Sequence, residues 1–178
     1  MLHKTQLRFL GIVAALLLAP ALSATAAGQK CFICIKPVVD MPVIMEKGTV
    51  RSPEFTVKHK LYIIKLQADN ALPSGQLDCL MGVYLIKAPD HCEMFNFHLA
   101  FEAEWKLYAG AQVVAHGIVQ GRDGNYESDN HQTSRWFASF TGEKNKKYVL
   151  EVTFTKDGTA LRVANPHIVI DLSPESLP

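Results

Sequence analysis

The chain has 178 residues, with 18 lysines and arginines against 17 aspartates and glutamates, and a formal net charge of +1 at pH 7. A charge so close to balance argues against a nucleic acid or an anionic membrane surface as the partner, because both require a concentrated basic surface. The basic run of Lys144, Lys146 and Lys147 lies beside Gly142 and Asn145, and we expect it to be a solvated turn.

The first 26 residues have the layout of a secretory signal peptide. Lys4 and Arg8 precede an apolar run over 9–19, and Ala24-Thr25-Ala26 supplies a small-residue cleavage site. The run is shorter than the ~20 apolar residues that span a bilayer, and no later segment approaches that length. We therefore predict that residues 1–26 are cleaved and that the mature protein is periplasmic or secreted, without stable membrane insertion. Cleavage leaves 152 residues, a length typical of one domain, with 16 basic residues against 17 acidic ones.

Four cysteines follow the predicted signal peptide. In an oxidising compartment they are expected to form a disulfide framework, for which the sequence alone allows three pairings. We favour Cys79 with Cys92, because a strand over Leu80–Lys87 and a turn after it return the chain to within disulfide reach. Cys31 then pairs locally with Cys34.

The segment Cys31-Phe32-Ile33-Cys34 also has the spacing of a redox motif. A thioredoxin-like site needs its first cysteine at a helix N-terminus, where the helix dipole lowers the thiol pKa. Here Ile35–Val39, followed by Pro42, favours an extended chain. A zinc site of four cysteines has suitable ligand types, but the spacing of Cys79 and Cys92 is unlike the usual ligand pair. The disulfide interpretation is preferred, and no cofactor is expected.

Most ordered segments alternate apolar and polar residues with a period of two, which is typical of half-buried strands. Asp157-Gly158 adds a hairpin signal. The expected strands are Ile35–Val39, Val43–Met45, Phe55–Gln67, Leu80–Lys87, Phe97–Leu107, Gln112–Val119, Trp136–Phe140, Tyr148–Thr155, Leu161–Ala164 and His167–Leu172. This pattern, without a convincing amphipathic helix, predicts an all-β fold: one antiparallel β-sandwich domain over 27–178, immunoglobulin-like or a jelly roll, with about nine or ten strands.

The longest polar stretch, Gly121–Ser134, is expected to be a loop. Asp123, Asn125, Glu127 and Asp129 alternate along it and offer the oxygen ligands that calcium prefers. The match to a helical calcium loop fails, because serines stand where that loop needs its glycine and its bidentate glutamate. A calcium site in a sandwich loop is one hypothesis, and a solvated loop is the other.

Three aromatic residues, Tyr108, Tyr126 and Trp136, fall at strand ends or in loops. Their rings are candidates for stacking on a sugar or for anchoring a protein partner. Trp136 stands next to Phe137, and one of two adjacent strand residues must face the core. For Trp136 a core position is therefore the competing interpretation.

Glu102 and Glu104 project from the same face of an expected strand, ~7 Å apart by strand rise. Glycoside hydrolysis uses a carboxylate pair of this kind. Lectin-like sandwich glycosidases carry a third acid shortly after the pair, whereas Trp105-Lys106-Leu107 follows here. Motifs for a nucleophile elbow, a metalloprotease, a phosphate loop or a dinucleotide site are missing from the sequence. We therefore expect a protein that is not an enzyme.

A pattern of core and turn residues runs through the second half of the chain: Trp105-Lys106-Leu107, Gly110, Phe140, Gly142, Tyr148, Leu150, Val152, Phe154, Asp157, Leu161 and Pro166. It resembles a pattern in uncharacterised exported bacterial β-sandwich proteins and covers Phe97–Asp171. The resemblance implies a fold and not an activity. Members of such families often begin with a lipid-modified cysteine, and Gly28-Gln29-Lys30 before Cys31 departs from that signal.

Three functions are compatible with these observations. The first is an exported noncatalytic binding protein, such as an inhibitor or immunity-type protein of the cell envelope, with a protein partner. The alternative is a carbohydrate-binding module with a glycan as ligand. The second alternative is a hydrolase whose active site is assembled from distant residues.

Overall fold

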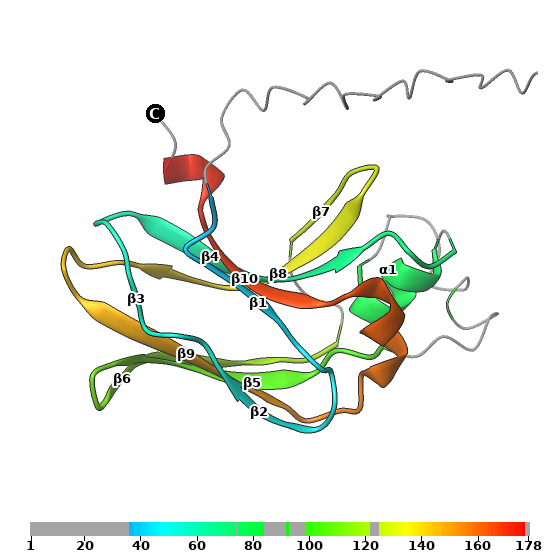
Figure 1. Ribbon diagram of the computed structural model, residues 1–178, viewed down its shortest axis with the longest axis horizontal. Coiled ribbons are helices and arrows are strands. Elements are labelled where there is room, and N and C mark those ends of the chain that lie inside the picture. The colour runs from blue at the N-terminus through cyan, green and yellow to red at the C-terminus, as the bar shows by residue number, and fades with distance from the viewer. Residues whose placement is uncertain (1–35, 74, 84–91, 93–98, 122–124, 177–178) are drawn as a thin grey trace, which may run out of the picture. The chain divides into compact units, whose positions relative to one another are not determined.

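The alternating segments form two antiparallel sheets in a computed structural model, which describes residues 36–73, 75–83, 92, 99–121 and 125–176. The sheets are the two layers of a sandwich (Figure 1). Ile35–Pro178 cluster as one compact unit. The predicted all-β sandwich is confirmed.

Each sheet is named here after its central strand. The β4 sheet consists, in order, of β1 (Val39–Pro42), β10 (His167–Leu172), β4 (Leu61–Asp69), β8 (Gln132–Thr141) and β7 (Tyr126–Ser128). The β9 sheet consists, in order, of β2 (Gly48–Arg51), β9 (Lys147–Phe154), β5 (Ala103–Ala109) and β6 (Gln112–Val119). The short strand β3 (Phe55–Thr56) also pairs with β9, further along the edge that β2 occupies.

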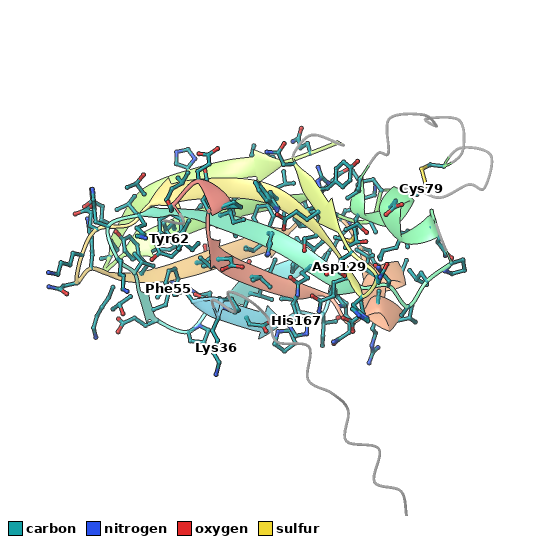
Figure 2. All side chains as sticks on the ribbon, turned by 90° about the horizontal axis from the view of Figure 1, so that it is seen from above. Lys36, Phe55, Tyr62, Cys79, Asp129 and His167 are labelled. Carbon is teal, nitrogen blue, oxygen red and sulfur yellow. A yellow bond between two sulfur atoms is a disulfide. The ribbon has the colours of Figure 1, made fainter. Side chains whose placement is uncertain are left out.

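The core lies between the two sheets and follows the predicted alternation. In β9 the buried residues are Tyr148, Leu150, Val152 and Phe154. At one end of the core four aromatic rings, from β3, β4, β8 and β9, lie with centroids 5.6 to 6.4 Å apart: Phe55, Tyr62, Phe140 and Tyr148. Aromatic pairs at such separations stabilise beyond the area they bury. This cluster joins the two sheets at the end of the sandwich that lies far from Cys79 (Figure 2).

The expected strand Leu80–Lys87 is wrong at its start, where helix α1 (Gln76–Met81) continues through Leu80. Leu77, Leu80 and Met81 are buried, at the i, i+3 and i+4 positions that place side chains on one helix face. Gly82 ends the helix at a φ of 72° and donates its N–H to the last turn. A helix of six residues is too short to show its period in the sequence.

The expected strand Leu161–Ala164 is also wrong, because a 3₁₀ helix, η1 (Thr159–Ala164), occupies it. Its buried residues Leu161 and Ala164 are three apart, which is the 3₁₀ repeat. Asp157 does not close a hairpin; its carboxylate accepts the N–H of Thr159 at 3.0 Å and begins this helix. The chain then crosses to β10 in the other sheet.

The stretch Gly121–Ser134 is not a loop throughout, since it contains β7 and the start of β8, which pair as a hairpin. The expected strand Phe55–Gln67 is divided: β3 belongs to the β9 sheet, and the chain crosses over before β4 begins. Other boundaries shift. Strand β1 runs over Val39–Pro42 rather than Ile35–Val39, and the expected strand Val43–Met45 is absent. Strand β5 begins at Ala103 rather than at Phe97. The sequence pattern does not predict β2. Residues 84–87 and 97–98 lie outside the description.

The predicted disulfide between Cys79 and Cys92 is confirmed, with the two Cα atoms 5.5 Å apart. The prediction placed a strand directly after Cys79, whereas Cys79 lies within helix α1, which continues to Met81. Cys31 and Cys34 lie outside the described residues. Helix α1 lies at one end of the sandwich (Figure 1), and Cys79 is among its buried residues.

Arg135 places a guanidinium in the core, with 1% of its surface exposed. Its Nη1 donates to Met81 O and its Nη2 to Gly121 O, both at 2.9 Å. The guanidinium carbon lies 5.5 Å from the ring centroid of Phe101. These contacts join β8 to the end of α1 and to the chain that follows β6.

Substitution Arg135→Met keeps an apolar chain of similar length but removes the donors to the buried carbonyl of Met81 and to the carbonyl of Gly121. We expect the free energy of unfolding to fall by about 2 to 4 kcal/mol, measured by urea denaturation. Arg162→Met on exposed η1 is the matched control and should change it little. Equal stabilities of the two variants would show that Arg135 does not hold this end of the fold.

Removal of the disulfide by Cys79→Ser with Cys92→Ser releases a loop with a sequence separation of 13. The loss of loop constraint should cost about 3 kcal/mol, seen as a lower denaturation midpoint. The control is Cys31→Ser with Cys34→Ser. The predicted bridge that it removes would enclose a much shorter segment, so the loss of unfolding free energy should be smaller. A larger loss in the control would contradict the assignment of the Cys79–Cys92 bridge as the main constraint.

Candidate binding site

Strand β6 is an open edge of the β9 sheet. It pairs with β5 on one side, and no strand in the described ranges pairs with its other side. Gln112–Val119 contains no lysine, arginine, aspartate or glutamate. Val113, Val114 and Ile118 expose 40%, 39% and 63% of their surface. An uncharged edge with exposed aliphatic side chains is a template for pairing with another chain.

Two local features shape β6. Its register with β5 shifts between Leu107 and Tyr108, which makes Val114 an extra, bulged residue. Gly117 pairs with Trp105, and a Cβ atom there would lie 2.7 Å from the indole Nε1 of Trp105. A glycine is therefore required for the buried indole to lie across the strand. This contact fixes β6 against the core while its outer edge stays unpaired.

A groove of about 710 Å³ adjoins this edge. Strand β6 contributes Ile118 and Val119 to its lining, β8 contributes 136–139, and the C-terminal segment contributes Glu175. Ile118 belongs both to the open edge and to the groove. We call the two together the β6 surface.

Trp136 brings an unpartnered donor to the groove. Its main-chain N–H donates to Asn125 O at 2.8 Å. Its indole Nε1 is buried and makes no hydrogen bond to the described residues. Because buried polar groups nearly always have a partner, a turn of this ring that brings Nε1 to an acceptor on a bound molecule would complete the site. Trp136 is thus neither a core residue nor a freely exposed ring.

The buried ammonium beside Trp136 has carboxylate partners within the chain. Lys65, which pairs with Trp136 across the strands, is 8% exposed. Its Nζ lies 3.5 Å from a carboxylate oxygen of Asp171 and 3.9 Å from one of Glu127. A buried ammonium needs such partners, because desolvation alone would be costly. The Lys65 ammonium therefore needs no anion from a bound molecule.

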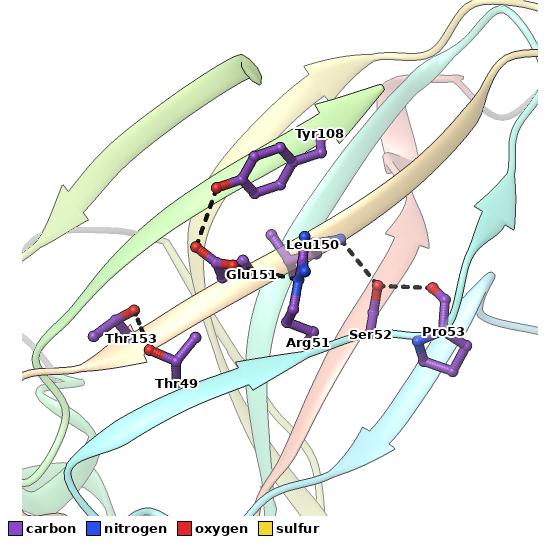
Figure 3. A network of polar contacts seen from close by, with 8 residues as sticks. All are labelled: Thr49, Arg51, Ser52, Pro53, Tyr108, Leu150, Glu151 and Thr153. Carbon is purple, nitrogen blue, oxygen red and sulfur yellow. Dashed lines mark hydrogen bonds and ion pairs between the residues drawn. The ribbon is translucent and has the colours of Figure 1, made fainter. Parts of the chain in front are cut away.

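Tyr108 lies elsewhere, on the face of the β9 sheet that carries Arg51 and Glu151 (Figure 3). Its hydroxyl donates to Glu151 Oε1 at 3.2 Å, and the Arg51 guanidinium carbon lies 5.2 Å from its ring centroid. Arg51 also pairs with Glu151 at 3.3 Å. One face of the ring is therefore covered by a guanidinium.

Tyr126 lies on β7, opposite Arg135, and packs against the core. The three aromatic residues predicted as binding candidates thus occupy three different places. Only Trp136 lines a groove with exposed apolar residues beside it.

The predicted calcium ligands do not gather in the described part. Asp123 lies outside it. The main-chain oxygen of Asn125 accepts from Trp136, and Glu127 lies near Lys65. Among the described residues, no three His, Cys, Asp or Glu side chains lie close enough together to hold a metal ion. A calcium site that includes Asp123 stays a prediction.

Asp129 uses its carboxylate to close the turn between β7 and β8. Oδ1 accepts the main-chain N–H groups of His131 and Gln132 at 2.7 and 2.8 Å. These hydrogen bonds favour the charged form and lower the pKa of Asp129. The residue is a structural part of the turn (Figure 2).

The two glutamates considered as a carboxylate pair, Glu102 and Glu104, have different surroundings. Glu102 precedes β5 and its Oε1 lies 3.5 Å from Lys156 Nζ, whereas Glu104 is exposed on β5.

Sequence reasoning missed the exposed side chains of β6, although it placed the strand with its observed bounds. Strand order decides which strand ends a sheet, and alternation along one strand carries no such information. The lack of charge over Gln112–Val119 was the available signal.

The comparisons with known proteins support the fold. No protein-family model matches the chain, and no curated protein matches it. The crystal structure of a protein from Sulfurospirillum deleyianum is similar, with a TM-score of 0.51 and 11% sequence identity, over 79% of this chain and 99% of that one. At this identity the likeness shows the fold alone.

Within the described residues, no helix has the length and apolar character needed to cross a membrane.

The turn at Asp129 should respond to acid. Because the pKa of Asp129 is lowered in the folded chain, its stabilising contribution is present above the ordinary value of 3.8 and is lost as the pH falls through the lower folded value. NMR titration of its carboxyl carbon should give a midpoint below 3.8, with the amide shifts of His131 and Gln132 changing in parallel. In the variant Asp129→Asn, which has no carboxyl group at this position, the amide shifts of His131 and Gln132 should no longer change over this pH range. A midpoint at or above the ordinary value would contradict the two hydrogen bonds.

Proposed function

We propose that this chain is an exported, noncatalytic binding protein that holds a protein partner at the β6 surface. The carrying observation is the concentration of exposed aliphatic side chains on an unpaired strand. In the described part, five large hydrophobic residues are exposed, and three of them lie on β6. Exposed apolar groups gathered on one edge are typical of a protein interaction site.

The proposed mode of binding is strand addition. An extended segment of the partner pairs its main chain with the outer edge of β6, beyond the bulge at Val114. Apolar side chains of that segment contact Ile118, and a carbonyl oxygen accepts the indole N–H of Trp136 once the ring turns toward the groove. Since β6 carries no lysine, arginine, aspartate or glutamate, an uncharged segment fits it best.

An inhibitor or immunity-type role in the cell envelope is the finer form of this proposal. Its support is the signal-peptide pattern of residues 1–26, together with a sandwich cross-linked by the Cys79–Cys92 disulfide. A preorganised scaffold binds without an ordering cost, which suits a tight inhibitor.

Photo-crosslinking from single positions tests the surface. The crosslinking amino acid p-benzoylphenylalanine replaces Ile118 in one variant and Val163 in the control, which is 66% exposed on η1. In cells that produce the protein naturally, position 118 should give a product with one protein, identified by mass spectrometry, and position 163 should not. With that partner purified, hydrogen exchange should slow at the β6 amides.

Affinity measurements then separate the parts of the surface. Ile118→Lys places an ammonium in the apolar contact and should weaken binding about tenfold or more. Trp136→Phe removes the Nε1 donor and keeps an aromatic ring, so a smaller loss is expected. Val163→Lys should leave the affinity unchanged. The proposal is overturned by equal crosslinking from both positions, by no product, or by products made only of two copies of this chain.

A further inference from the structure

A second cavity, of about 890 Å³, lies at the end of the sandwich near the aromatic cluster. Four segments that are distant in the sequence line it: the chain before β1, the crossing from β3 to β4, the turn from β8 to β9, and the end of β10. Its volume is within the range of small-molecule sites, about 300 to 1,000 Å³. It shares no lining residue with the groove beside β6.

The charged residues that line this cavity are all lysines. They are Lys36, Lys58, Lys60, Lys144 and Lys147, and the lining holds no aspartate or glutamate. Three of the five come from outside the 144–147 run, so the fold builds a basic cluster that the sequence does not show locally. A concave surface lined by one sign of charge concentrates ions of the opposite sign.

Most of this positive charge is not neutralised by the described part of the chain. Lys147 pairs with Glu54 at 2.7 Å. Lys60 Nζ donates to the main-chain oxygen of Ser176 at 2.9 Å, which satisfies one donor but leaves its charge. Lys36, Lys58 and Lys144 have no ion-pair partner among the described residues, so an anion is the complementary ligand.

The remainder of the lining is largely apolar. Val57 and Tyr62 are buried members of the core, and Val38 and Leu172 pack against it. Lys36, in the chain before β1, and Tyr62, on β4, both line the cavity (Figure 2). Inorganic phosphate would use the lysines alone, and a neutral apolar molecule would leave them without a counter-charge. The lining therefore matches a ligand that has both parts.

We propose that this cavity binds an anionic amphiphile, a molecule with one phosphate or carboxylate group on an apolar chain. The lysine ammonium groups bind the anionic head, and the apolar residues contact the chain. A nucleic acid or sulfated polysaccharide fits less well, because it requires a stripe of cations along an extended surface rather than a cluster around one cavity. The proposal is independent of the β6 surface.

Calorimetric titration of the purified protein with dodecyl phosphate and dodecanoate, below their micelle concentrations, tests the ligand class. Both should bind, and both should bind about tenfold or more tightly than dodecanol or inorganic phosphate, because only they satisfy both halves of the lining. Vesicles of phosphatidylglycerol distinguish a free amphiphile from a membrane surface. Binding to vesicles without binding to the monomeric amphiphiles would overturn the proposal, as would tighter binding of heparin or of an oligonucleotide.

Paired substitutions locate the site. Lys58→Gln with Lys144→Gln removes two unpaired charges and should weaken dodecyl phosphate about tenfold or more. Lys47→Gln with Lys106→Gln removes the same charge from exposed positions outside the cavity and should not. Leu172→Ser reduces the apolar contact and should weaken dodecyl phosphate while leaving inorganic phosphate unchanged. Equal effects of the two lysine pairs, or none, would place the binding elsewhere.

Discussion

A guanidinium buried between the two sheets imposes the strictest requirement on this fold. Taking the charge of Arg135 out of water is costly unless its donors find acceptors. Met81 O and Gly121 O supply two of them, from the end of α1 and from the chain after β6. Those two segments must therefore reach Arg135 together, whatever the surface residues around them are.

This requirement extends to the backbone beside the arginine. Gly82 has a φ of 72°, and a Cβ atom there would lie 2.8 Å from Nη1 of Arg135 and 2.6 Å from Leu99. A side chain at Gly82 is excluded both by conformation and by space. The same guanidinium anchors Gly121, two residues after β6 ends at Val119. The open edge of β6 is thus held at both of its ends, by the short turn to β5 and by the contact with Arg135.

The predictability of each element follows from the length over which its pattern repeats. Strands β6, β9 and β10 are long enough to show a period of two, and their bounds were predicted closely. The helix α1 and the 3₁₀ helix η1 have six residues each, and their buried residues were mistaken for strand positions. The Cys79–Cys92 disulfide was predicted because its pairing requires only that the chain bring two cysteines close together over a sequence separation of 13. The groove at Trp136 depends on strand order, which no local pattern encodes.

The net charge of the chain is near zero, but the charge is distributed unevenly over the folded protein. The sequence places lysines at 36, 58, 60, 144 and 147, and only the fold brings them around one cavity. The same fold leaves β6, which has no lysine, arginine, aspartate or glutamate, at an open edge. Salt screens the attraction of the cavity for an anion, whereas apolar burial and main-chain pairing drive contact at the edge and depend little on ionic strength. The two surfaces therefore select different classes of ligand by different forces, and one chain can hold both classes without competition.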